Sequence, residues 1–311
     1  MSIEYQKITL PTPYPVGPIH IYYFVINGVR ILFDSGPPTT TAINVLKAEI
    51  DLKQLDYLFI THFHPDHYGG AHIIEQLSPA QIIFSKYDLA IYEYYDLRVK
   101  FLFAFLSQLG VTTELIAALE KTFSGYKNAI PLPKNFQILE ESQDLTRDLG
   151  ISFLTCPGHS QSDIIYQVDD FCITGDTLLR DIFQTPLLDL NLSTKTGRFL
   201  NYENYCQSIS ILKSIEHQKI LTAHNEAIVS VDYQIQFYYQ KIIEKAEKLK
   251  PILNQKKSVY EIMMNIFPFT VSKPFLFYVK LSELLFIKDY LNDQELLKNA
   301  LTESNIMDFS S

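Results

Sequence analysis

A cluster of three histidines and an aspartate is the feature that most constrains how this chain can fold. The residues Thr61-His62-Phe63-His64-Pro65-Asp66-His67 follow an apolar segment, Leu55 to Ile60, and precede Gly69-Gly70. We expect the apolar segment to be a strand that ends in a tight turn, with His62 and His64 on one side because they are two residues apart. Neutral imidazoles and carboxylates are the usual ligands of zinc and similar ions. With only 8 histidines in 311 residues, this clustering favours a metal site over a polar loop.

Four further short segments, spread over most of the chain, carry residues of the same kind. In chain order they are Phe33-Asp34-Ser35-Gly36, Pro157-Gly158-His159-Ser160, Thr174-Gly175-Asp176-Thr177 and Ala223-His224. Together with the histidine cluster they resemble the ordered motifs of the metallo-β-lactamase superfamily, whose signature is His-x-His-x-Asp-His. The resemblance covers about residues 30 to 226, and an ordered set of five motifs is far more specific than any single match.

The apolar patterns of the chain predict an α/β protein. Up to Phe84, strand patterns alternate with two helix patterns, which run from Thr39 to Ile50 and from about Asp66 to Gln76, and strand patterns return from Phe136 to Thr222. The predicted strands include Gln81–Phe84, Ile164–Val168 and Lys219–Thr222, and Asn27-Gly28 between two early strands predicts a tight hairpin. Two strand-rich halves joined by a middle segment are what a two-sheet sandwich with outer helices requires. The resemblance implies the same architecture, an αββα sandwich of two mixed β-sheets with outer helices.

Two regions depart from this pattern and are predicted to be helical. Residues 87–126 have long apolar stretches at helical spacing, which indicate a helical insertion. The long helix predicted from Val231 is expected to end at Pro251, after which the composition shifts. We therefore predict a metallo-β-lactamase-like domain over 1–250 and a helical module over 251–311. This module resembles the small C-terminal module, in some cases winged-helix-like, of one hydrolase branch of the superfamily.

The resemblance implies two metal ions held by seven side chains. The first set is expected to be His62, His64 and His159, and the second set Asp66, His67 and His224. Asp176 would bridge the two sets. Zinc is the expected metal, with manganese and iron as alternatives. Two such ions about 3.5–4 Å apart would share a hydroxide that attacks the substrate.

Two of the aspartates have further expected roles. Asp34 is expected to lie behind a ligand histidine and to fix its orientation, although a turn residue at a strand end is an equally good interpretation. Asp66 is hypothesised to deliver a proton to the leaving group in addition to binding metal. Gly175 is expected to let the backbone approach the site closely.

The resemblance favours hydrolysis of an ester-like bond, either a thioester, as in the glyoxalase II-like hydroxyacylglutathione hydrolases, or a lactone. The aromatic insertion is predicted to cap the site, with Tyr92, Tyr95 and, from an early strand, His20 as candidate residues of the substrate pocket. Alternatively, its apolar face packs on the sandwich or on a second subunit of a homodimer. No cationic cluster that would bind the carboxylates of glutathione is evident in the sequence.

Two other activities remain open alternatives. A phosphodiesterase or ribonuclease of the same fold would use the two metals and the basic residues Lys248, Lys250, Lys256 and Lys257, but a net charge of −9 argues against binding to nucleic acid. A persulfide dioxygenase would use one iron and fewer ligands than this chain offers. A small molecule is therefore the expected substrate.

The remaining features concern the location of the protein. No apolar run reaches the roughly 18–20 residues that span a bilayer, and the N-terminus lacks the pattern of a secretory signal. The 3 cysteines, an odd number, do not suggest a disulfide framework. We therefore expect a cytoplasmic protein that does not span a membrane. Cys156 is close in sequence to His159 but is expected to be a small buried residue.

Overall fold

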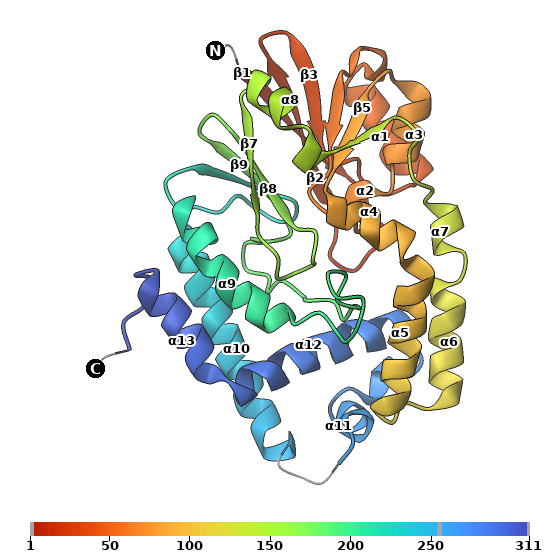
Figure 1. The fold of residues 1–311 in the computed structure, drawn as a ribbon, viewed down its shortest axis with the longest axis vertical. Helices are drawn as coiled ribbons and strands as arrows, with labels where there is room; N and C mark the ends of the chain where they lie inside the picture. Colours follow the sequence, from red (N-terminus) through yellow and green to blue (C-terminus); the bar gives the residue numbers. More distant parts are fainter. Residues whose placement is uncertain (1–2, 254–256, 310–311) are drawn as a thin grey trace.

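Two mixed β-sheets form the upper half of the molecule in the computed structural model, which describes residues 3–253 and 257–309 (Figure 1). The first sheet has six strands in the order β1 (Ile3–Leu10), β2 (Ile19–Ile26), β3 (Val29–Phe33), β4 (Tyr57–Phe59), β5 (Gln81–Phe84) and β6 (Phe136–Ile138). The second sheet has four, in the order β10 (Lys219–Thr222), β9 (Phe171–Gly175), β8 (Ile164–Val168) and β7 (Ile151–Thr155). Both combine parallel and antiparallel pairs, which confirms the predicted two-sheet architecture.

The two sheets enclose an aromatic core between them. Side chains of a strand point alternately to its two faces, so Phe59 of β4 faces the second sheet while its neighbour Leu58 faces outward. The ring of Tyr166 on β8 packs 5.3 Å from that of Phe33 and 5.4 Å from that of Phe59, measured between ring centres. This contact fixes the ends of β3 and β4, from which the site is built, against the second sheet.

Helices cover the outer face of each sheet, so the molecule has four layers. On the first sheet lie α1 (Thr40–Glu49) and α3 (Ala71–Leu77), and on the second lie α9 (Asn201–Ser214) and α10 (Val231–Leu253). The α1 helix begins where the Thr39 side chain accepts a hydrogen bond from the Ala42 amide, a standard N-terminal cap. The outward apolar residues of both sheets are buried beneath these helices.

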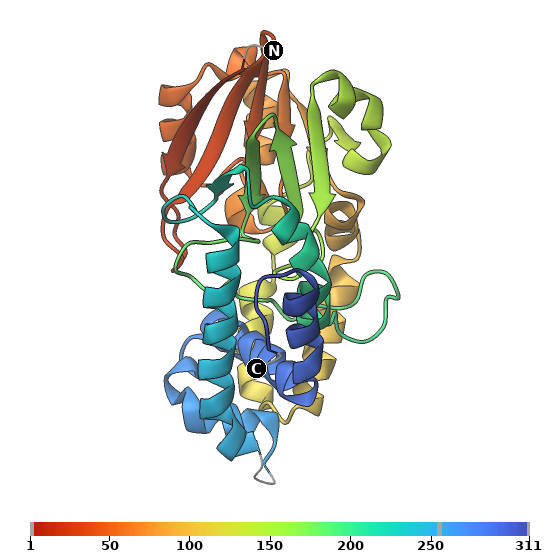
Figure 2. The same ribbon diagram turned by 90° about the vertical axis from the view of Figure 1, so that its left-hand side faces the viewer.

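A second group of helices forms the lower half of the molecule (Figures 1 and 2). From the predicted insertion come α4 (Lys86–Glu93), α5 (Tyr95–Gln108), α6 (Thr113–Phe123) and α7 (Tyr126–Ala129), and from the C-terminal region come α11 (Val259–Ile266), α12 (Pro274–Asn292) and α13 (Gln294–Glu303). Both regions share one apolar cluster with α9 and α10. Residues 257–309 contain no strand that could form a wing. The division into domains at 250 stays a prediction.

Two predicted helix boundaries are wrong. The helix expected from Asp66 to about residue 76 is divided into α2 (Pro65–Tyr68) and α3, because the Gly70 amide donates to the Gly36 carbonyl of another segment instead of continuing the helix. The α10 helix continues past Pro251 to Leu253, since one proline removes a single helical hydrogen bond near the end. The remaining short elements are α2, α8 (Gln143–Asp148) and three 3₁₀ turns. Within the described ranges, no helix is long and apolar enough to cross a membrane.

Candidate metal centre

The ends of two parallel strands create the floor of the site. Strands β3 and β4 run side by side and end at the same edge of the first sheet, so Asp34 and the Thr61-His62 pair lie next to each other. Asp34 has a φ of 63°, which turns the chain sharply after β3. Its carboxylate accepts hydrogen bonds from the Thr61 amide (2.8 Å) and the Thr61 hydroxyl (2.9 Å). The buried Asp34 therefore holds the histidine-rich turn in place.

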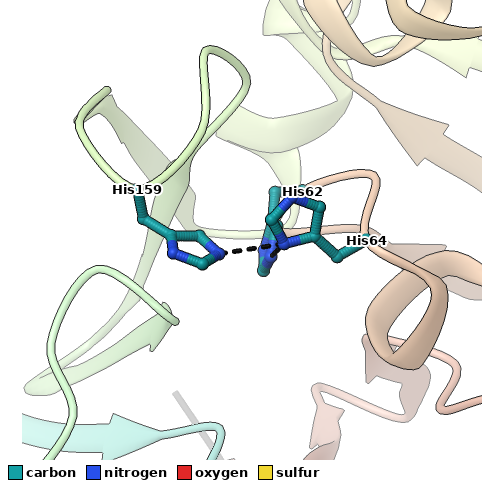
Figure 3. Close-up of side chains that lie close together, drawn as sticks. All are labelled: His62, His64 and His159. Atoms are coloured by element: carbon teal, nitrogen blue, oxygen red, sulfur yellow. Dashed lines mark hydrogen bonds between the residues drawn. The ribbon is translucent and has the colours of Figure 1, made fainter. Parts of the chain in front are cut away.

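The first ligand set consists of three imidazoles from two loops (Figure 3). The Nδ1 atom of His64 lies 3.0 Å from Nε2 of His62 and 2.9 Å from Nε2 of His159, although His159 is far from both in sequence. Burial lowers the pKa of His62 well below its usual range, and burial together with the neighbouring His159 lowers the pKa of His64 to about 3. Because the lowered pKa values keep the rings of His62 and His64 neutral, their lone pairs are available to a metal ion.

The second ligand set consists of Asp66, His67 and His224. The Asp34 carboxylate lies 2.8 Å from Nδ1 of His67, and the Pro18 carbonyl lies 2.8 Å from Nδ1 of His224. Each contact directs the Nε2 atom of its histidine toward the other members of the set, and His224 Nε2 is 3.4 Å from an Asp66 oxygen. A partner on the far nitrogen of a ligand histidine fixes its tautomer and orientation. This is the position expected for Asp34.

Asp176 lies between the two sets and presents one oxygen to each. Its Oδ1 atom is 3.4 Å from Nε2 of His67 and 3.5 Å from Nε2 of His224, whereas its Oδ2 atom is 3.7 Å from Nε2 of His159. The preceding Gly175 has a φ of 52°, and a Cβ atom there would lie 2.7 Å from the Thr61 hydroxyl oxygen. Only glycine therefore lets β9 bring Asp176 this close to the histidine turn.

The chemistry of these side chains fits divalent metal ions. Nε2 of His67, Nε2 of His224 and Oδ1 of Asp176 are buried and have no hydrogen-bond partner, a costly arrangement for polar atoms unless they bind a cation. Ligand nitrogens around a tetrahedral zinc lie about 3.3–3.4 Å apart, given Zn–N bonds of about 2.0–2.1 Å. The 3.4 Å between His224 and Asp66 in the second set matches this spacing, and the 2.9–3.0 Å between the imidazoles of the first set is somewhat shorter. In each of three groups of residues, the ligand atoms of the members lie within 4.8 Å of one another. The groups are His62, His64 and His159; His62, His67 and Asp176; and Asp66, His67 and His224.

The buried charges of the second set stabilise one another. Burial acts to raise the pKa of Asp176, but the adjacent His67 and His224 outweigh it and hold that pKa well below its usual range. Burial acts to lower the pKa of His67, but Asp176 and Asp34 hold it well above its usual range. The site therefore attracts positive charge, and protons and metal ions compete for it.

A cavity of about 520 Å³ opens from the cluster, and four predicted ligands, His64, Asp66, His159 and Asp176, form part of its wall. Of the three candidate pocket residues, Tyr95 lines the cavity and His20 and Tyr92 do not. Both ring nitrogens of His20 are used elsewhere, at 2.9 Å from the Thr9 hydroxyl and 2.9 Å from the Asn225 carbonyl. Tyr92 packs against the outer core of the first sheet. His20 instead ties the loop that carries His224 to β1.

Several residues that line the cavity were not selected as candidate site residues in the sequence analysis. Tyr14 lies in the β1–β2 turn and lines the cavity, and burial, reinforced by the charge of Asp66, raises its pKa to about 12. The proline- and glycine-containing turn around it was the available clue. The N-terminal part of α12 and the loop after β9 also line the cavity, but their apolar residues look like ordinary core.

The variant Asp34→Asn is expected to weaken metal binding about 10–100-fold while leaving the fold intact. Asparagine tolerates the left-handed backbone but offers one acceptor oxygen instead of two, so it cannot hold both Thr61 and His67 as the carboxylate does. Competition with a chromophoric chelator measures the affinity. The matched control is Asp169→Asn, an exposed turn aspartate with a φ of 54°. Equal affinities of wild type and Asp34→Asn would show that Asp34 is only a turn residue.

Two sets of buried imidazoles and carboxylates that share one aspartate, at the edge of a two-sheet sandwich, are typical of a metal-dependent hydrolase. The family model of the metallo-beta-lactamase superfamily matches residues 14–205. The chain belongs to this superfamily. Four of the five motifs recognised in the sequence supply side chains of one site in the structure. The fifth motif supplies Asp34, which orients His67.

Similar proteins extend over most of the chain. The probable metallo-hydrolase YqjP of Bacillus subtilis is 25% identical over 279 residues, which cover 86% of each protein. The metallo-beta-lactamase family protein TTHA1429 of Thermus thermophilus has a similar fold, with a TM-score of 0.71 and 19% identity over 92% of this chain and 93% of its own. A beta-lactamase domain protein of Burkholderia ambifaria has a TM-score of 0.68 and 18% identity over 93% of this chain and 87% of its own. The shared fold therefore includes the lower helices.

Proposed function

We propose that the protein is a binuclear metal-dependent hydrolase of ester-like carboxylic bonds, with thioesters and lactones as the substrate classes. One observation carries this proposal: Asp176 directs one oxygen toward each ligand set, beside a largely apolar cavity. His62, His64 and His159 would hold one ion, Asp66, His67 and His224 the other, and Asp176 both. When bound, such ions lower the pKa of water and polarise a carbonyl oxygen. Zinc is the proposed metal.

The protein itself would orient the substrate and exclude water from the reaction. Tyr95 and the apolar side chains around it cover the cavity on the side away from the sheets, so a substrate acyl group would be held in a site of low polarity. Asp34 and the Pro18 carbonyl keep His67 and His224 fixed. A preorganised site of this kind does not need to rearrange during the reaction, so no reorganisation free energy adds to the barrier.

The residues around the cavity favour this function over the two alternatives. In a nucleic acid, the phosphates that flank the cleaved linkage need cations of the protein, yet among the described residues that line the cavity the one Lys or Arg is Arg98, which is paired with Asp189. Lys248, Lys250 and Lys257 do not line it, and Lys256 lies outside the described residues. A mono-iron dioxygenase would leave one complete ligand set without a role.

A hydrolysis panel on the metal-loaded protein tests the proposed function. Thioesters, lactones and a phosphodiester are compared side by side, and bound metal is measured by elemental analysis. We expect two ions per chain, turnover of a thioester or a lactone, and loss of turnover on treatment with a chelator. One iron per chain with oxygen consumption, or turnover of the phosphodiester alone, would contradict the proposal.

Asp66 is proposed to accept the proton that the attacking water loses and to deliver it to the leaving group, as well as to bind metal. Its carboxyl group lines the cavity and faces His224. In Asp66→Asn we expect kcat to fall about 10²-fold for an alkyl ester, whose alkoxide needs a proton, and much less for a p-nitrophenyl ester, whose leaving group does not. Metal content measured in parallel identifies ligand loss. Equal losses on both esters would mean that Asp66 acts only on the metal.

A further inference from the structure

The cavity beside the ligand sets is walled mainly by apolar side chains from three segments that are distant in sequence. These segments are α5, the loop that follows β9, and the N-terminal part of α12, which passes beneath the sheets toward α5 (Figure 1). The apolar side chains that line the cavity include Val99 and Leu102 of α5, Phe183 and Leu187 of the loop after β9, and Leu276 and Val279 of α12. We call the space between them the acyl pocket.

The walls of the acyl pocket are held in place by the core of the lower half. On α12, Phe277 and Leu281 are fully buried, whereas Leu276 and Val279 are half-buried and line the cavity. The Tyr278 hydroxyl donates to the Leu188 carbonyl (2.7 Å), and the Leu188 amide donates to the Ser282 hydroxyl (2.9 Å). These bonds fix the loop after β9 to α12. The pocket is thus formed before any ligand binds, as is usual for small-molecule sites.

The charged pair in the wall is neutralised within the protein. The Arg98 guanidinium donates to both oxygens of Asp189 at 2.8–3.0 Å and also to the Ile91 carbonyl at 3.0 Å. Gln161 donates to the Leu190 carbonyl (2.8 Å) next to this pair. A negatively charged acyl group would therefore be buried without an unpaired cation of its own, at a large cost in free energy.

We propose that the acyl pocket binds an uncharged alkyl chain, so that the enzyme prefers esters and thioesters of medium-length fatty acids to acetyl esters and to acyl groups with a terminal carboxylate. This inference rests on the proposed function for its reaction. The chain would lie between α5 and α12, and the carbonyl group would point to the end of the cavity formed by His64, Asp66, His159 and Asp176.

A homologous series of acyl thioesters with one small thiol tests the preference. We expect kcat/KM to rise about two- to fourfold for each added methylene from acetyl through butyryl and hexanoyl to octanoyl, as expected when each CH₂ leaves water. Succinyl, which resembles butyryl in length but carries a carboxylate, should be at least about tenfold slower than butyryl. A flat series, or a succinyl rate equal to that of butyryl, would overturn the inference.

Two variants with a matched control test whether the alkyl chain of the substrate binds in the acyl pocket. Val279→Trp fills the pocket and should lower kcat/KM for octanoyl by at least about tenfold while changing that for acetyl less than about twofold. Val229→Trp makes the same substitution at a residue that is 93% exposed and should change neither. Leu276→Ala enlarges the pocket and should shift the preference to longer chains, which keeps the test decisive if Val279→Trp does not fold. Unchanged chain-length profiles in both pocket variants would overturn the inference.

A binding measurement separates this inference from the proposed reaction. Calorimetry with octanamide and acetamide on the chelator-treated protein reports on the pocket without turnover. Tighter binding of octanamide that is lost in Val279→Trp, in a protein that hydrolyses no ester, would support the pocket and contradict the proposed function. Turnover of acetyl thioester with no selective binding of octanamide would support the proposed function and contradict the acyl pocket.

Discussion

The variant Asp176→Asn is expected to lower kcat/KM by about 10³-fold or more and to reduce the bound metal below two ions per chain. In the wild type, Oδ1 of Asp176 faces His67 and His224 while Oδ2 faces His159. An amide has the same shape but only one acceptor oxygen, and its NH₂ group cannot bind a cation. Asparagine can therefore serve one ligand set only. Loss of several kcal/mol of transition-state stabilisation corresponds to a rate loss of this size.

Elemental analysis and kinetics on the same preparations test this expectation. The matched control is Asp170→Asn, which removes a carboxylate from the same sheet at an exposed position where its partner is Lys219. The control should bind two ions and turn over at the wild-type rate, because exposed ion pairs contribute little. If Asp176→Asn retained two ions and more than a tenth of the activity, Asp176 would not bridge the two sets.

The variant Tyr166→Ala is expected to reduce the free energy of unfolding by about 3–5 kcal/mol. Tyr166 is fully buried between the two sheets, where its ring contacts Phe33 and Phe59. Its hydroxyl donates to the Ile60 carbonyl at 2.8 Å, directly before the histidine turn. Truncation leaves a cavity in a closely packed region and an unpaired carbonyl, and both are costly. The effect should appear in urea unfolding of the metal-loaded protein.

Two further variants separate the ring from the hydroxyl. Tyr166→Phe keeps the ring and loses only the hydrogen bond, so we expect a loss of about 1–3 kcal/mol. Tyr233→Ala makes the same truncation at a residue that is 63% exposed and should change stability by less than about 0.5 kcal/mol. A loss below about 1 kcal/mol in Tyr166→Ala would show that the sheets are not tightly packed at this point.

Strand positions followed from the sequence more closely than helix boundaries did. The strands β5, β8 and β10 begin and end at the predicted residues, because a short apolar run bounded by polar or turn residues is a local signal. The break between α2 and α3 depends on a hydrogen bond from Gly70 to Gly36, more than thirty residues away. The continuation of α10 past Pro251 likewise depends on packing, which local propensity does not include.

The candidate site was predicted in its chemistry but not in its surroundings. Residue types and motif order were enough to select seven side chains that the structure brings together, and their role as metal ligands stays a prediction. The pocket residues were predicted less well, and of His20, Tyr92 and Tyr95 only Tyr95 lines the cavity. Tyr92 and Tyr95 belong to the same aromatic stretch, and only the packing of α4 and α5 decides which of them faces the metal centre.

The order of the motifs and the short apolar runs of the two strand-rich halves determined, from the sequence alone, a two-sheet fold with a histidine- and aspartate-rich site at one edge. The tertiary structure decided which atoms meet there: each oxygen of Asp176 with its own ligand set, and Asp34 with His67. It also decided that α5, α12 and the loop after β9 enclose one apolar space. Such contacts join residues tens to hundreds of positions apart, and they depend on how whole elements pack, which no local periodicity specifies.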